Sequence, residues 1–155
     1  MKTIISILIV IFGALGIAVK TSEDVHRSCN CSSPLCGCTV TCLDTGEIPN
    51  CICGVLTCIC KCDPKDAQNP NDGPVPTMTS DQEANSIKSE GYFRGLGTGD
   101  GQTIANGIKA LREAIKSGDS KKYYLNANTT ESTFAKLPGS QQAAWENWAN
   151  NNLKQ

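Results

Sequence analysis

Ten cysteines determine the chemistry that this 155-residue chain can offer, and all of them lie between Cys29 and Cys62. Cysteine thiols can oxidise to disulfides, bind soft metal ions as thiolates, or exchange electrons as a reactive pair. The spacing of the cysteines and the compartment in which the chain folds decide which of these chemistries applies. The rest of the chain has no cysteine, so the chemistry is confined to one short segment.

The cysteines form two similar halves. The first half has the pattern C-x-C-x4-C-x-C-x3-C, and the second has C-x-C-x4-C-x-C-x-C. The first four cysteines of each half coincide when one half is shifted by 22 residues, which indicates an internal duplication. The two halves consist of Cys29, Cys31, Cys36, Cys38 and Cys42, and of Cys51, Cys53, Cys58, Cys60 and Cys62.

Each C-x-C motif predicts a strand with two sulfur atoms on one face, because alternate residues of a strand point to the same side. The four-residue spacers between these motifs suit hairpin turns. A hairpin in the first half would place Cys31 near Cys36 and Cys29 near Cys38, with the matching arrangement in the second half. Alternatively, the two halves stack and cross-link each other. The spacing leaves the connectivity open.

We expect all ten cysteines to form disulfides. A block this small cannot bury enough apolar surface to hold its fold without covalent cross-links. Residues 1–18 support this expectation, because they have the layout of a cleavable secretory signal peptide: Lys2, an apolar run, and small residues up to Ala18. Export would deliver the chain to the extracellular space, where disulfides persist. Cleavage would also remove the only segment that could hold the chain at a membrane.

Thiolate metal binding is the alternative. The repeated C-x-C spacing resembles that of metallothioneins, particularly the small fungal copper-binding ones. The resemblance covers only the cysteine block and implies that the same ten cysteines would bind the metal. The block departs from that pattern in its apolar residues, among them Ile52, Leu56 and Ile59. A redox-active pair is disfavoured, because the chain has no C-x-x-C motif.

Charge and titratable residues exclude other classes of function. The net charge is −1 and the basic residues form no cluster, which argues against nucleic acid as a partner. His26 is the only histidine, so any Ser-His-Asp or Cys-His machinery would depend on it. The acidic residues are scattered and form no pair suited to acid–base catalysis. We therefore predict no catalytic activity and no cofactor.

The predicted fold is α+β with two modules. A small disulfide-rich β-hairpin repeat spans residues 21–63, and a small all-α bundle spans residues 80–155. Four prolines lie in or beside the segment 64–79, which predicts an extended linker between the two modules.

The helical half shows capping and periodicity signals. Ser80 and Glu83 form a predicted capping box, and the helix that follows is expected to turn Ala84, Ile87 and Tyr92 inward. The segment 102–117 is the clearest helix, because apolar residues recur on one face. Separate helices are expected at 120–125 and 130–137, and a last helix from residue 140. The recurring residues of the second helix are Ile104, Ile108, Leu111 and Ile115.

Few residues of the helical half are candidates for contacts with partners. Trp145 and Trp148 are expected in the core, and the alternative is an exposed platform that stacks on sugars. Asn128 begins an Asn-Thr-Thr sequon in a predicted interhelical turn, which makes it a candidate for N-glycosylation.

These observations favour a secreted, disulfide-stabilised binding or structural protein, with self-association as one form of the structural role. Its partner would be an extracellular protein or glycan. Besides the metal-binding alternative, the rigid block could serve as a defence peptide or as a protease inhibitor. An inhibitor would need an exposed reactive bond, for which the loop 43–50 is the only roomy candidate.

Overall fold

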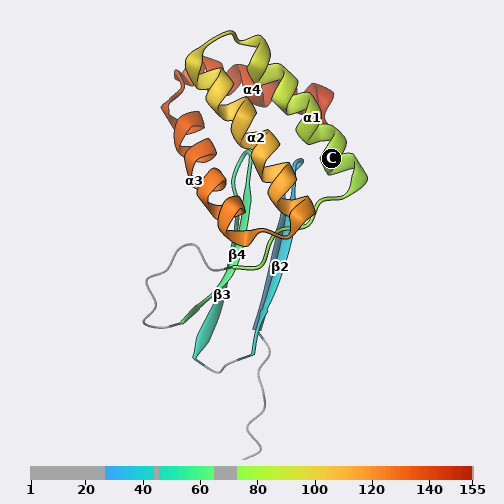
Figure 1. The fold of residues 1–155 in the computed structure, drawn as a ribbon, viewed down its shortest axis with the longest axis vertical. Helices are drawn as coiled ribbons and strands as arrows, with labels where there is room; N and C mark the ends of the chain where they lie inside the picture. The colour runs from blue at the N-terminus through green and yellow to red at the C-terminus, as the bar shows by residue number, and fades with distance from the viewer. Residues whose placement is uncertain (1–26, 44–45, 65–72, 155) are drawn as a thin grey trace, which may run out of the picture.

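The computed structural model describes residues 27–43, 46–64 and 73–154. The predicted signal peptide, His26 and residues 65–72 of the predicted linker lie outside the described residues. The fold class is α+β, as the sequence predicts, and the described residues form four strands followed by four helices (Figure 1). The elements are β1 (Arg27–Ser32), β2 (Gly37–Cys42), β3 (Glu47–Cys53), β4 (Cys58–Pro64), α1 (Ser80–Gly95), α2 (Gly99–Ser117), α3 (Ser120–Lys136) and α4 (Gly139–Asn152).

Each cysteine half forms an antiparallel hairpin, β1 with β2 and β3 with β4. The predicted register is correct in the second hairpin, where Cys53 lies opposite Cys58. It is wrong in the first hairpin, where Cys31 lies opposite Cys38 and not opposite Cys36. The Ser33 hydroxyl explains the difference. It accepts hydrogen bonds from the backbone N–H groups of residues 35 and 36, which draws Cys36 into the turn.

Helix α1 begins one residue earlier than the sequence predicts. Thr79 is the N-cap, and its hydroxyl and the Gln82 side chain bond each other's backbone N–H groups as a capping box. The predicted inward face is wrong at Ala84 and Ile87, which are exposed, whereas Tyr92 is partly buried against the core. The buried side chains are mostly small and polar, which lets neighbouring segments approach closely. They are Asn85, Ser86, Ser89 and Phe93.

The predicted face of α2 is confirmed, with Ile104, Ile108 and Leu111 buried. Helix α3, in contrast, runs unbroken through the turn predicted around Asn128. Asparagine and threonine residues are weak helix formers in isolation. Burial of one face overrides this preference, because its side chains repeat at helical spacing. They are Tyr123, Tyr124, Ala127, Thr130 and Phe134.

A close approach between α2 and α3 provides a test of this packing. A Cβ atom at Gly107 would overlap the Thr130 hydroxyl and lie 3.1 Å from the Thr130 Cβ. We expect Gly107→Ala to lower the free energy of unfolding by about 1–3 kcal/mol. Gly91→Ala in α1 is the matched control, because open space surrounds that position. It should raise stability by about 0.5–1 kcal/mol. Urea denaturation of both variants measures the difference, and a harmless Gly107→Ala would contradict the packing.

The tips of both hairpins reach into the helical half (Figure 1). Leu35 in the first turn and Leu56 in the second turn are each 2% exposed. They belong to the same apolar cluster as Phe93, Ile104 and Trp145 of the helices. The hairpins and the helices therefore share one core, although sequence composition separates them sharply.

Candidate functional site

Four disulfides cross-link the two hairpins. Three of them join residues 22 apart, which are equivalent positions of the two repeats. The constant offset places β1 alongside β3 and β2 alongside β4 in the same direction. Both arrangements considered from the sequence are therefore present, since each half is a hairpin and the halves are cross-linked. The pairs are Cys29–Cys51, Cys31–Cys53, Cys38–Cys60 and Cys42–Cys62.

Cys36 and Cys58 are free thiols in the structure, so eight of the ten cysteines that were expected to pair do so. Both thiols are buried, at 2% and 0% exposure. The Cys58 Sγ lies 3.0 Å from the Cys36 carbonyl oxygen and 2.7 Å from the Cys53 Sγ. The pair therefore lies directly beside the Cys31–Cys53 disulfide.

Tyr123 of α3 fixes this thiol pair from the helical side. Its hydroxyl donates to the Cys58 carbonyl oxygen at 2.9 Å, accepts from the Cys58 N–H at 3.1 Å, and lies 3.9 Å from the Cys36 Sγ. Burial raises the pKa of the Tyr123 phenol, so it stays a neutral hydrogen-bonding group. The side-chain hydrogen bond between the two thiols raises the pKa of Cys36 and lowers that of Cys58.

The hairpin interior is a stack of sulfur atoms. Its buried cluster consists of four cysteines and Val40, with further cysteines packed around them. In three triads the sulfur atoms lie within 4.8 Å of one another. Such triads suit a soft metal ion only when the thiols are reduced, because disulfide sulfur is not a thiolate. The triads are Cys29, Cys51 and Cys60; Cys31, Cys38 and Cys60; and Cys31, Cys53 and Cys58.

A carboxylate of α3 holds the turn of the second hairpin. The Glu131 Oε1 accepts hydrogen bonds from the backbone N–H groups of Leu56 and Thr57 and from the Thr57 hydroxyl, all at 2.9 Å. Sequence reasoning missed this contact, because a single glutamate on a helix carries no signal of a distant turn. The contact fixes the turn that carries Leu56 into the core.

Loss of the Glu131 carboxylate should loosen this turn. We expect Glu131→Ala to lower the free energy of unfolding by about 2–4 kcal/mol, because it leaves two backbone donors without their acceptor. Glu146→Ala in α4 is the control, since Glu146 is exposed. It should change stability by less than about 0.5 kcal/mol. Equal unfolding free energies for the two variants in urea would show that Glu131 does not hold the turn.

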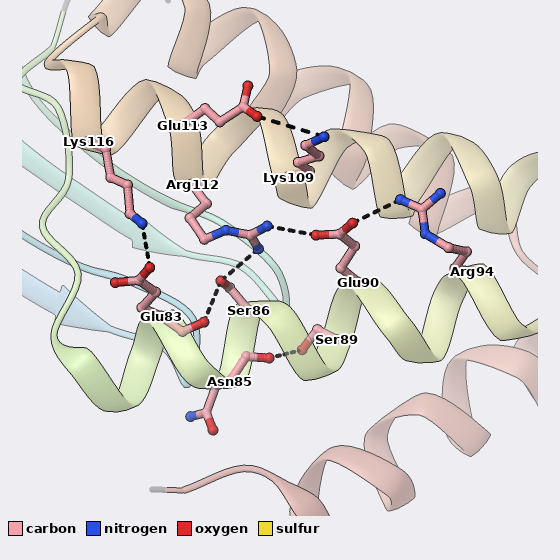
Figure 2. Close-up of polar contacts among 10 residues, drawn as sticks. All are labelled: Glu83, Asn85, Ser86, Ser89, Glu90, Arg94, Lys109, Arg112, Glu113 and Lys116. Atoms are coloured by element: carbon pink, nitrogen blue, oxygen red, sulfur yellow. Dashed lines mark hydrogen bonds and ion pairs between the residues drawn. The ribbon is translucent and has the colours of Figure 1, made fainter.

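Charged residues along the seam between α1 and α2 are neutralised by one another (Figure 2). The Arg112 guanidinium donates to the Glu90 carboxylate at 2.7 Å and to the Ser86 hydroxyl at 3.1 Å. Arg94 pairs with the other carboxylate oxygen of Glu90 at 2.8 Å. Lys116 pairs with Glu83 near the start of α1. This paired arrangement stabilises the helix pair and leaves these groups poorly suited to acid–base catalysis.

The Glu90 pairing predicts a dependence of stability on pH. Burial acts to raise the pKa of Glu90, but hydrogen bonds from Arg112 and Arg94 outweigh it and hold that pKa below its usual value. The stabilisation is therefore present above about pH 4.5, the ordinary range of a glutamate, and is lost as pH falls through the lowered pKa.

We expect Glu90→Gln to flatten the loss of stability between about pH 4.5 and pH 2. Glu113→Gln, at a residue whose side chain is 51% exposed, should keep the wild-type slope. Thermal melts at a series of pH values measure both slopes. Identical acid profiles for wild type and Glu90→Gln would contradict the pairing.

A polar cleft lies between the first hairpin and the start of α1. It combines two adjoining hollows of about 370 and 340 Å³ that share Ser32, Thr79 and Gln82 in their walls. The Gln82 amide crosses between the two elements, donating to the Ser33 carbonyl oxygen at 3.1 Å and to the Ser32 hydroxyl at 3.3 Å. Most of the residues that line the cleft carry a hydroxyl or an amide, and the exposed Asp81–Lys154 ion pair lies at its wall.

The remaining predicted site residues lie apart from this cleft. Trp145 is 1% exposed and packs in the core, so it offers no face for stacking on a sugar. Trp148 is partly buried against the same core, with its ring 5.2 Å from that of Trp145. Asn128 is exposed on α3, and its glycosylation stays a prediction. The candidate inhibitor loop is shorter than predicted, because residues 47–50 belong to β3. Leu43 in this loop is 68% exposed, and residues 44 and 45 lie outside the described residues.

No protein-family model, curated protein or solved structure matches the chain. The class is therefore set by the fold and its cross-links: a small disulfide-stabilised protein in which two stapled hairpins join a helical bundle. Over residues 27–43, 46–64 and 73–154, no helix has the length and apolar character needed to cross a membrane.

Proposed function

We propose that the chain is a secreted binding or structural protein of the extracellular space, without catalytic activity. The observation that carries this proposal is the set of four disulfides between the hairpins, since such bonds form and persist in oxidising compartments. The predicted signal peptide supports the same compartment. Covalent bonds stabilise the hairpins where apolar side chains are scarce, which favours survival outside the cell.

The polar cleft is the surface that suits a partner, which would be an extracellular protein or glycan. Its hydroxyl and amide groups can donate and accept hydrogen bonds without introducing a strong net charge. Thr39 contributes to its wall from β2. Thr41 follows two residues later on the same face of the strand, is also exposed, and does not line the cleft. The two threonines therefore form a matched pair for mutation.

Export is tested by expressing the full chain in a secretory host. We expect the protein in the medium, with its N-terminus generated by cleavage near residue 18. A chain that stays in the cytosol with its N-terminus intact would contradict the secretion proposal.

Binding at the cleft is tested on immobilised glycans and on extracellular proteins cross-linked to the exported chain. We expect Thr39→Val to weaken a captured interaction by about three- to tenfold, as loss of one hydrogen bond predicts. Thr41→Val should leave the affinity unchanged. Equal effects of the two substitutions would show that the cleft is not the binding surface.

If the chain acts as a structural protein, we expect it to bind further copies of itself. Ile48 and Ile52 lie on one face of β3 and are 51% and 60% exposed, and Leu43 is exposed nearby in the chain. Exposed apolar side chains that gather on one element favour contacts with another protein surface. Sedimentation velocity of the exported chain should show an oligomer that Ile52→Lys weakens. A monomer at every concentration would contradict this expectation.

Thiolate metal binding is the second candidate function, favoured by the three sulfur triads. It requires reduced cysteines, so it competes with the disulfide form for the same sulfur atoms. Native mass spectrometry of the exported protein distinguishes the two candidates, and titration of the reduced chain with Cu(I) measures its capacity. Retained metal on the exported protein would favour this candidate, and a metal-free oxidised protein would exclude it.

A further inference from the structure

The repeat symmetry leaves one pair of equivalent cysteines without a cross-link. Cys36 and Cys58 are 22 positions apart in the sequence, the same separation as in three of the four disulfides. Cys36 closes the turn of the first hairpin, Cys58 begins the strand after the turn of the second, and each is the third cysteine of its half. Cys36 and Cys58 are therefore equivalent positions of the two repeats, as are the three disulfide-bonded pairs with the same separation.

The local geometry brings the two thiols to one point. The Ser33 hydroxyl lies 3.5 Å from the Cys36 Sγ and 3.6 Å from the Cys58 Sγ, so a single oxygen atom contacts both sulfur atoms. The Cys58 Sγ is also 3.0 Å from the Cys36 carbonyl oxygen. Both residues are at most 2% exposed, so the two sulfur atoms meet this hydroxyl in a site closed to solvent.

We infer that Cys36 and Cys58 form a fifth disulfide in the mature protein, at the junction between the hairpin tips and the helices. The adjacent residue Leu35 and the nearby Leu56 carry the tips into the helical core, and Tyr123 contacts both cysteines. The fifth bond would join the two turns directly at the place where they enter the bundle. Of the four described disulfides, Cys31–Cys53 lies beside this point, and the other three lie farther along the strands.

The oxidant is a low-molecular-weight disulfide or the disulfide of an oxidoreductase. The Cys58 thiolate attacks one sulfur of this disulfide and displaces the other as a thiolate. The Cys36 thiolate then attacks the Cys58 sulfur of the mixed disulfide and displaces the second sulfur. The oxidant is thereby reduced to two thiols, which take up the two protons that the cysteines release. Since both cysteines are closed to solvent, this exchange has to precede the docking of the tips.

The inference depends on the proposed export in one respect only, because the oxidising compartment would supply the oxidant. A test on purified chain therefore separates the two. The fully reduced protein, without residues 1–18, is refolded in a buffer of reduced and oxidised glutathione. It is then denatured in guanidinium with an alkylating reagent and no reductant.

We expect a mass about 10 Da below that of the reduced chain, which is two hydrogen atoms for each of five bonds, and no alkyl group. Proteolytic mapping should give a cross-linked peptide that contains Cys36 and Cys58. A mass about 8 Da below the reduced chain, with alkyl groups on Cys36 and Cys58, would overturn the inference.

Two variants keep the result interpretable. The double variant Cys36→Ser/Cys58→Ser should refold with the four other disulfides and take up no alkyl group. The single variant Cys36→Ser should take up one alkyl group, located at Cys58. If the alkyl group of the single variant lay on Cys31 or Cys53, Cys58 would be paired within its neighbouring disulfide, and the proposed connectivity would be wrong.

Discussion

Replacement of Trp145 with alanine is expected to lower the free energy of unfolding by about 3–5 kcal/mol. Trp145 is among the largest fully buried side chains of the described residues, at 1% exposure. Its ring lies 4.7 Å from that of Phe93 and 5.3 Å from that of Tyr92. The substitution would leave a cavity in the cluster that also holds the hairpin tips, so both halves of the fold should lose stability together.

Trp148→Ala is the matched control for this prediction. Trp148 lies on the same helix and is only partly buried, so its loss should cost clearly less, about 1–2 kcal/mol. Chemical denaturation followed by circular dichroism measures both variants without relying on tryptophan fluorescence. A larger effect at Trp148 than at Trp145 would show that the core lies elsewhere along α4.

Removal of the Cys38–Cys60 disulfide by replacing both residues with alanine should cost about 3–4 kcal/mol. The bond closes a loop between residues 22 apart, for which the loss of chain entropy in the unfolded state predicts about 3 kcal/mol. Both cysteines are buried, at 5% and 0% exposure, so the double substitution also removes packing in the sulfur-rich interior.

The Cys42–Cys62 bond provides the comparison. Its residues are 20 apart, so the entropic contribution is nearly the same. Cys62 is only partly buried, so removal of this bond should cost less than removal of Cys38–Cys60. The urea midpoints of the two double variants test the order. If neither variant is less stable than wild type, the disulfides are not what stabilises the hairpins.

Local patterns were sufficient to predict several parts of this fold. The C-x-C motifs predicted strands with sulfur atoms on one face, and the 22-residue offset indicated two equivalent hairpins. The spacing of Ile104, Ile108 and Leu111 identified the buried face of α2. For the strands and for α2, the decisive information lies within the element itself, and for the repeat it lies in the comparison of two short segments.

Long-range contacts account for the parts that could not be predicted. Leu35 and Leu56 are apolar residues in short turns, and nothing near them in the sequence shows that they enter a helical core. The burial of the polar residue Asn85 also depends on distant contacts. Its amide donates to the carbonyl oxygens of Pro34 and Lys154, each at 2.9 Å, so burial follows from partners far away in the sequence.

For the candidate site, the sequence predicts which residues react but not how they are arranged. The cysteines were identified as the reactive residues, but their connectivity required the stacking of the hairpins. The polar cleft was not foreseen, because Thr39, Thr79 and Gln82 come from segments that become neighbours only when the first hairpin meets α1.

The disulfide-linked hairpins and the helices share one apolar cluster, so we expect the two parts to unfold as one cooperative unit. Thermal melting of the helices, followed by circular dichroism at about 222 nm with and without a reductant, tests it most directly. Because Leu35 and Leu56 pack against the helices, reduction of the disulfides should lower the melting temperature of the helical signal by more than about 10 °C. A helical signal that melts at the same temperature in both states would show that the helices fold independently and would contradict this expectation.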